Sequence, residues 1–155
     1  MYAGSNSDRY ANYRGHCLPD TEHSYHPDLY PMKSKNTAPE RDLRQELTRR
    51  KFRYRIHYRA IAGTPDIAFP KLKVALFVNG CFWHGHDCKY AASFREKPTG
   101  WKMRQRNTKE KDIDTYRDLK ENDWFPVISW ECRIKDNVEK EADRIAAILK
   151  SRTKY

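Results

Sequence analysis

The chain has 155 residues, a length typical of a single domain that can bury its own hydrophobic core. Lysine and arginine number 31 against 21 acidic residues, so the net charge is +10 with neutral histidines. That surplus favours a polyanionic partner, with nucleic acid ahead of an anionic membrane, although a soluble protein can also simply be basic. No apolar stretch reaches membrane-spanning length, and the N-terminal residues lack the hydrophobic core of a signal peptide. We therefore expect a cytoplasmic protein that does not bind membranes.

Residues 1–30 are rich in Tyr, His, Asp, Ser and Asn and show neither helical nor strand periodicity. We predict a flexible N-terminal arm over 1–30 and a single domain over 31–155. The aromatic and cationic side chains of this arm would also suit a segment that becomes ordered on nucleic acid. Cys17 lies in the arm, far in sequence from the other three cysteines, and is predicted to be a free thiol. In a cytoplasmic protein, four cysteines indicate metal binding or free thiols rather than disulfides.

A helix is predicted to begin just after Thr37. This residue can act as the N-cap, Pro39 falls in the first turn, and Glu40 lies three residues after the cap, as in a capping box. The surrounding segment Lys33–Arg59 contains ten lysines and arginines but only three acidic residues. Such a run is usually a solvated face, yet its density makes it the best candidate for contacts with phosphates.

Shorter apolar runs predict the strands of one sheet. After the first helix we expect a loose strand in 52–58, strands at 66–69 and 74–79, a helix at 101–122, a strand at 125–130 and a last helix capped by Asp136. The turn Pro70–Lys73 joins the two middle strands into a hairpin, with Asp66 near one of its ends. This order predicts an α/β domain in which helices flank a mixed central sheet.

The chemically richest stretch is Gly80–Cys88, which follows the apolar strand directly and holds two cysteines, two histidines and two large aromatic residues. Loops at strand ends are where α/β proteins usually build their sites. A four-coordinate structural zinc site prefers sulfur and nitrogen ligands, and the candidate ligands are Cys81, His86, Cys88 and Cys132. Their spacing is not the usual Cys-x2-Cys, so a set of buried thiols is the alternative. Zinc is favoured because neighbouring strands would bring Cys132 close to Cys81.

Phe82 and Trp83 are adjacent aromatic residues in the same loop. Two interpretations stay open for them. Ordinary core packing is the more common reason for such residues, whereas a functional interpretation makes them a wedge inserted between base pairs.

Hydrolysis of a phosphodiester needs carboxylates that hold Mg²⁺ and a group that activates water. Asp66, Asp112 and Glu40 are the candidate carboxylates. His84 is the candidate group for water activation, because the ordinary pKa of histidine lies near neutrality. Asp112 can equally be a helical surface residue and Glu40 a plain capping partner, so residue chemistry alone leaves the nuclease interpretation open.

Three segments of this sequence together resemble the very-short-patch repair (Vsr) DNA mismatch endonucleases: Pro65-Asp66, the run Phe77–Cys88, and Trp130-Glu131-Cys132. Asn36–Glu40 fits the same pattern, and the resemblance extends from Leu29 to Ile134. It implies a restriction-endonuclease-like fold with a structural zinc added. It also implies an Mg²⁺-dependent hydrolase that nicks one strand of double-stranded DNA 5′ to the thymine of a T·G mismatch, and we expect it to act as a monomer.

The resemblance assigns a role to each candidate residue. Asp66 would bind the Mg²⁺, His84 would be the catalytic histidine assisted by Asp112, and Glu40 matches the family's N-terminal glutamate. The zinc ligands would be Cys81, His86, Cys88 and Cys132. Phe82 and Trp83 would intercalate into DNA, and Leu29 falls roughly where the family carries a methionine that enters from the other groove. Asn79 stands where the best-studied pattern has a histidine beside the metals, and asparagine cannot act as a general base.

Two other functions therefore stay open. One is a zinc-stapled DNA-binding module without catalysis, which the presence of Asn79 keeps in consideration. The other is a sequence-specific restriction or nicking endonuclease on the same fold, because a fold does not determine a substrate.

Overall fold

The computed structural model describes residues 35–92 and 99–153, so the predicted arm, with Cys17 and Leu29, lies outside the described residues. The elements in chain order are helix α1 (Ala38–Arg49), strands β1 (Arg55–Ile56) and β2 (Ile67–Phe69), the 3-10 helix η3 (Pro70–Leu72), strand β3 (Val74–Asn79), helices α2 (Lys89–Ala92) and α3 (Thr99–Glu121), strand β4 (Phe125–Trp130), and helices α4 (Glu131–Asp136) and α5 (Val138–Arg152). Within the described ranges, no helix is both long and apolar enough to cross a bilayer.

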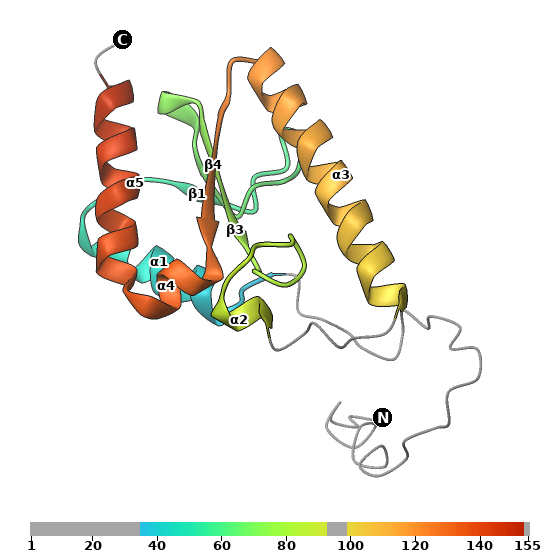
Figure 1. Cartoon of the computed structure of the whole chain (residues 1–155). Coiled ribbons are helices and arrows are strands. Elements are labelled where there is room, and N and C mark those ends of the chain that lie inside the picture. The colour runs from blue at the N-terminus through green and yellow to red at the C-terminus, as the bar shows by residue number, and fades with distance from the viewer. Residues whose placement is uncertain (1–34, 93–98, 154–155) are drawn as a thin grey trace, which may run out of the picture. The chain divides into compact units, whose positions relative to one another are not determined.

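The four strands form one mixed sheet in the order β1-β2-β3-β4. Strand β2 pairs antiparallel with β1 and β3, whereas β4 runs parallel to β3 along the other edge. Helix α3 lies on one side of this sheet, and α1 and α5 lie on the other (Figure 1). The predicted α/β class with a mixed sheet and flanking helices is confirmed. Pro126 is tolerated in β4 because this strand lies at the edge of the sheet, where a residue without a backbone N–H does not break a hydrogen bond between strands.

Strand β3 sends alternate side chains into two apolar layers, as the period of an extended chain requires. Val74 and Leu76 pack in the larger layer with residues of α1 and α5. Ala75 and Phe77 pack in the smaller layer, where Leu119 of α3 meets them. The same alternation carries Asn79, the last residue of the strand, to the α3 side, where it contacts Tyr116.

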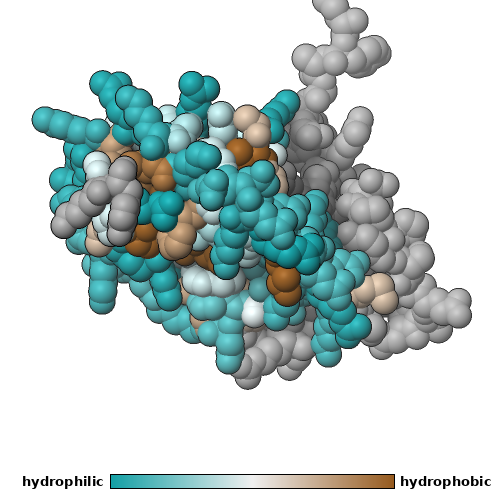
Figure 2. All heavy atoms as spheres, turned by 90° about the horizontal axis from the view of Figure 1, so that it is seen from above, coloured by the Kyte–Doolittle hydropathy of each residue, from teal (hydrophilic) through white to brown (hydrophobic). Residues whose placement is uncertain are grey.

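The surface seen in Figure 2 is mostly hydrophilic, with small hydrophobic areas scattered over it. This is the expected exterior of a chain in which 34% of residues are charged. The apolar residues are concentrated in the two layers that hold the sheet between its helices.

Two local predictions need correction. Asn137, and not Asp136, caps the last helix: its side chain accepts the backbone N–H of Lys140 at 2.8 Å. Asp136 instead ends the short helix α4, which the sequence analysis missed, and it accepts a hydrogen bond from Lys89. The loose strand predicted in 52–58 is reduced to β1, because His57 adopts a left-handed φ of 45° that a strand cannot continue through.

Candidate active site and metal centre

A cleft of about 940 Å³ lies where the start of α1, the carboxyl end of β3 and the middle of α3 approach one another. Six of the predicted site residues line it: Glu40, Asp66, Asn79, Trp83, His84 and Asp112. They come from three elements and two loops, so the fold collects into one cavity side chains that are separated by as many as 72 positions (112 − 40).

Asp66 precedes β2, and its Oδ2 accepts the backbone N–H of Val78 at 2.8 Å. Burial raises the pKa of this carboxyl to about 6, and the charge of Glu40 adds to the shift, while the Val78 hydrogen bond opposes it. An ionised carboxylate in this position is less well solvated than it would be in water. A bound cation would supply the missing stabilisation, so the environment of Asp66 fits a metal ligand.

Glu40 is 2% exposed and has two roles at the start of α1. Its Oε1 accepts the hydroxyl of Thr37 at 2.9 Å and the backbone N–H of the same residue at 3.3 Å. Its Oε2 accepts the backbone N–H of Asn36 at 2.9 Å. The capping interaction predicted from the sequence is therefore present, and it holds the carboxylate rigidly at the wall of the cleft.

His84 and Asp112 form a hydrogen-bonded pair across the cleft. The distance from His84 Nδ1 to Asp112 Oδ2 is 2.5 Å, and both side chains are about one quarter exposed, at 22% and 24%. The carboxylate fixes the ring orientation through Nδ1, which leaves Nε2 as the atom that can exchange a proton with a substrate.

Asn79 is buried, and its side-chain amide donates to the hydroxyl of Tyr116 on α3 at 3.0 Å. Burial raises the pKa of Tyr116 to about 12, so the phenol stays protonated. Tyr116 was not anticipated as a site residue. Its only signal in the sequence is its position one helical turn after Asp112.

Glu40, Asp66 and His57 form a group whose possible ligand atoms lie within 4.8 Å of one another. His57 was missed as a site residue because it belongs to a basic run in which nothing marks it as close to Asp66. The backbone provides the link: the N–H of His57 donates to the carbonyl of Asp66 at 3.1 Å.

A second group combines Cys81 and Cys88 with His86 and Cys132, and their ligand atoms also lie within 4.8 Å of one another. Strands β3 and β4 pair in parallel, with Asn79 opposite Trp130, and so bring the loop that carries Cys81 close to the start of α4, which carries Cys132, as predicted. Burial raises the pKa of the Cys81 thiol to about 12, so a thiolate here requires a bound cation. The soft donor set of three sulfurs and one imidazole fits a metal ion.

Trp83 of the loop lines the cleft, and neither Trp83 nor its neighbour Phe82 belongs to an apolar core. Phe82 and Trp83 are half-buried, with ring centroids 4.8 Å apart. Trp101 of α3, which was not anticipated, stacks on Trp83 at 4.8 Å, and the guanidinium of Arg104 lies 4.8 Å from the Trp83 ring centroid.

The family model described as DNA mismatch endonuclease Vsr matches residues 27–90. The type II nicking enzyme V.XorIIP of Xanthomonas oryzae pv. oryzae is 34% identical over 105 residues, which cover 68% of this chain and 77% of that protein. The chain belongs to the Vsr family. The type II nicking enzyme V.HpaIIP of Haemophilus parainfluenzae is 34% identical over 113 residues, 70% of this chain and 77% of the relative. The DNA mismatch endonuclease Vsr of Escherichia coli (strain K12) is 28% identical over 102 residues, 66% of this chain and 65% of the relative.

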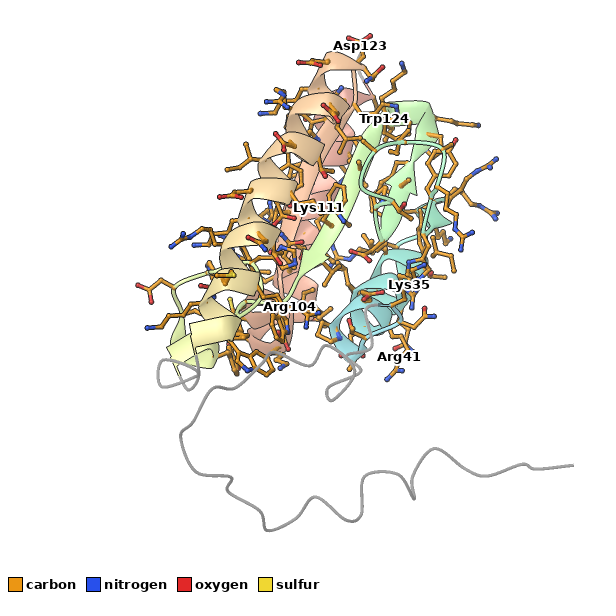
Figure 3. The ribbon with its side chains drawn as sticks, turned by 90° about the vertical axis from the view of Figure 1, so that its right-hand side faces the viewer. Lys35, Arg41, Arg104, Lys111, Asp123 and Trp124 are labelled. Carbon is orange, nitrogen blue, oxygen red and sulfur yellow. The ribbon has the colours of Figure 1, made fainter. Side chains whose placement is uncertain are left out.

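Family membership confirms that this Vsr protein is an endonuclease, and that the nucleic acid expected from its charge is DNA. The basic residues that line its cleft are Lys35, Arg59, Arg104 and Lys111. Figure 3 shows Arg104 and Lys111 along α3, and Lys35 at the start of α1.

The basic residues of the run Lys33–Arg59 in this Vsr protein do not all face the cleft. Arg49 and Arg50 form salt bridges with Glu46, at 2.7 Å and 2.8 Å, on the side of α1 that meets α5. Among the described residues of this run, Lys35 and Arg59 are the lysine and arginine that line the cleft, and α3 supplies Arg104 and Lys111.

Proposed function

We propose that this endonuclease nicks one strand of double-stranded DNA 5′ to the thymine of a T·G mismatch, with Mg²⁺ held at Asp66. The observation that carries the proposal is the His84–Asp112 pair, which lines the same cleft as the partly buried carboxylate of Asp66. We further propose that the fold is restriction-endonuclease-like and that the protein acts as a monomer. A mixed sheet between helices, with carboxylates gathered at one end of its central hairpin, supports the proposed fold.

The residues divide the work of hydrolysis among them. Asp66 and Glu40 would provide carboxylate oxygens for Mg²⁺, which when bound would stabilise negative charge on the phosphate and lower the pKa of bound water. His84 accepts a proton from the attacking water at Nε2, and Asp112 keeps the ring in place through Nδ1. Asn79 cannot take a proton. Its hydrogen bond to Tyr116 instead fixes the end of β3 against α3.

Recognition of the mismatch is assigned to the aromatic residues at the side of the cleft. Phe82 and Trp83 would enter the base stack, with the Trp101 ring supporting Trp83. Unstacking one base step costs a few kcal/mol, and the cost is lower where the pair is already weakened, as at T·G. Leu29, which lies outside the described residues, is proposed to insert from the opposite groove.

The metal centre of Cys81, His86, Cys88 and Cys132 is proposed to hold zinc as a structural ion. These four sulfur and nitrogen ligands are within reach of one ion, and a structural zinc with four protein ligands would have no position open for a substrate. Such an ion would connect the loop after β3 to the start of α4, and so hold the aromatic residues of that loop at the cleft.

A sequence-specific nicking activity is the second candidate, because several relatives carry the name type II nicking enzyme. A DNA-binding module without catalysis fits less well, since the His84–Asp112 pair has the geometry of a catalytic dyad.

The test uses the whole chain with Mg²⁺ and duplexes that differ only in a T·G or T·A pair, each labelled at one 5′ end. We expect a single nick 5′ to the mismatched thymine on a denaturing gel, and none with Asp66→Ala. Equal nicking of both duplexes would transfer support to the sequence-specific activity. If the wild-type protein leaves every duplex intact, the result would favour the DNA-binding module without catalysis.

A further inference from the structure

We propose that His57 is a direct ligand of the catalytic cation and makes the site prefer a transition-metal cation such as Mn²⁺ to Mg²⁺. This inference rests on the proposed function, because it concerns the cation at Asp66. It adds a residue to the site, and it specifies which kind of ion that site takes.

The spacing of the three side chains fits a shared ion. Possible ligand atoms of Glu40, His57 and Asp66 lie within 4.8 Å of one another. Ligands on opposite sides of one cation lie about 4.2 Å apart when each bond is about 2.1 Å long. Small side-chain rotations therefore suffice for the three atoms to bind one ion.

Each carboxylate has capacity left for such an ion. Oε2 of Glu40 accepts one hydrogen bond, from the N–H of Asn36 at 2.9 Å, and a carboxylate oxygen can accept two. Oδ2 of Asp66 likewise accepts the N–H of Val78 at 2.8 Å. The backbone bonds that position both groups thus leave them able to bind a cation.

His57 is held beside these carboxylates by backbone that an ordinary loop would not adopt. Its φ is 45°, in the left-handed region that non-glycine residues seldom occupy. Two hydrogen bonds fix this conformation: His57 N–H donates to the carbonyl of Asp66 at 3.1 Å, and Tyr58 N–H donates to that of Pro65 at 3.2 Å. The imidazole and the Asp66 carboxylate are therefore attached to one rigid backbone unit.

The hydrogen bonds of Asn36 determine which nitrogen of the His57 ring carries a proton. Arg44 Nη2 donates to Oδ1 of Asn36 at 2.9 Å, and because a guanidinium can only donate, this atom is the amide oxygen. Nε2 of His57 lies 3.4 Å from the same oxygen, so Nε2 is the protonated nitrogen of this contact. The lone pair is then on Nδ1. A histidine that binds a metal through one nitrogen typically donates its other N–H to such an oxygen.

The chemistry of the donors sets the preference among cations. Mg²⁺ binds oxygen ligands almost exclusively and keeps much of its water, whereas imidazole suits transition-metal cations. The other histidine that lines the cleft, His84, has its Nδ1 bonded to Asp112. Within the described residues, His57 is therefore the histidine that can add a nitrogen ligand to the carboxylates of Glu40 and Asp66.

The experiment measures binding of Mn²⁺ to the zinc-loaded whole chain by electron paramagnetic resonance, without DNA and without any activity readout. His57→Gly removes the imidazole and accepts the left-handed backbone without strain. His57→Asn is a second variant, because asparagine also tolerates this φ. His84→Gln is the matched control, since it removes a cleft imidazole outside the group. Zinc content and melting temperature verify the fold of each variant.

We expect the Mn²⁺ signal of the wild type to show coupling to an imidazole nitrogen. His57→Gly and His57→Asn should lose this coupling and bind Mn²⁺ at least tenfold more weakly, while Mg²⁺ affinity changes by less than threefold. His84→Gln should keep both the coupling and the affinity. Coupling that survives in both His57 variants, or a wild type that binds no Mn²⁺, would overturn the assignment. Failure of the proposed function is distinct: the coupling would be present, but no cation would support nicking of a T·G duplex.

Discussion

The carboxyl group of Asp66 lies where ionisation is less favourable than in water. Burial raises its pKa to about 6, and the neighbouring Glu40 adds to this, while the N–H of Val78 offsets only part of the effect. Folding therefore favours the protonated form. The stability that this group contributes is fully present below its unfolded pKa of 3.8 and is lost as the pH rises through 6.

Asp66→Asn should consequently stabilise the protein in buffer without added divalent cations at pH 8, but not at pH 4. The amide keeps an oxygen for the Val78 N–H and carries no charge. A shift from 3.8 to about 6 corresponds to about 3 kcal/mol at most. Thermal unfolding at the two pH values measures the difference. Saturating Mg²⁺ should reduce the stability difference between the variant and the wild type at pH 8, because the ion stabilises only the wild-type carboxylate. A difference that Mg²⁺ does not change would argue against Asp66 as a ligand of the ion.

At the scale of elements, the parallel pairing of β3 and β4 positions both the candidate metal centre and the aromatic residues of the loop after β3. Asn79 lies opposite Trp130 at the end of the two strands, so the loop after β3 and the start of α4 emerge side by side. Cys81 and Cys132 follow these strand ends and meet, and the backbone N–H of Cys132 donates to the sulfur of Cys81 at 3.4 Å. The intervening aromatic residues are thereby held at the cleft.

Cys132→Ala should lose the bound zinc and lower the melting temperature, because a structural ion contributes folding free energy. Elemental analysis is expected to give one zinc per chain for the wild type and none for the variant. Cys17→Ala provides the control, since Cys17 is not a predicted ligand, and it should keep the ion. Well-folded wild type without zinc would contradict this prediction.

Trp83→Ala tests whether the loop aromatics form a wedge. The ring is half-buried and lies outside both apolar cores, so its removal should change the melting temperature little. Stacking on a base is worth about 1–3 kcal/mol, so preference for a T·G duplex over its matched partner should fall roughly ten- to hundredfold. Phe77→Ala, at a core aromatic that is 8% exposed, should instead cost about 3–5 kcal/mol of stability. A large loss of stability in Trp83→Ala with unchanged preference would identify Trp83 as a core residue.

Elements with local signals could be predicted from the sequence. The start of α1 follows from Thr37, Pro39 and Glu40 alone, and the apolar run at 74–79 became β3. The cap of the last helix was assigned to Asp136 in place of Asn137, because the choice depends on which residue has the extended backbone between α4 and α5, and the local sequence does not show this.

The site was predictable to the extent that a motif marks its residues. Both the metal-centre ligands and the His84–Asp112 pair come together in the structure. His57 and Tyr116 were missed for one reason. Their proximity to Asp66 and Asn79 depends on pairing between β1 and β2 and on packing of α3 against β3, and neither contact leaves a pattern in the local sequence.

At the scale of the whole molecule, the net charge of +10 does not show which basic side chains are available to DNA, because this depends on where each one lies. Arg50 forms ion pairs with Glu46 and Asp143, so part of the basic run stabilises contacts between α1 and α5. The basic side chains that line the cleft instead share it with a group of carboxylates. Under the proposed function, these basic side chains would attract the phosphate backbone to the cleft, and the carboxylates would remain available to the metal ion.

Lys111→Gln should weaken binding to T·G and matched duplexes by the same factor, because a phosphate contact carries no sequence information. Each phosphate contact contributes about 0.9 to the slope of log affinity against log salt, so this slope should fall by about one. Lys120→Gln is the matched control: it removes a lysine from the same helix at a position that does not line the cleft, and it should leave the slope unchanged. Fluorescence anisotropy titrations at several salt concentrations measure both. Equal slopes for the two variants would place the DNA on another face of the molecule.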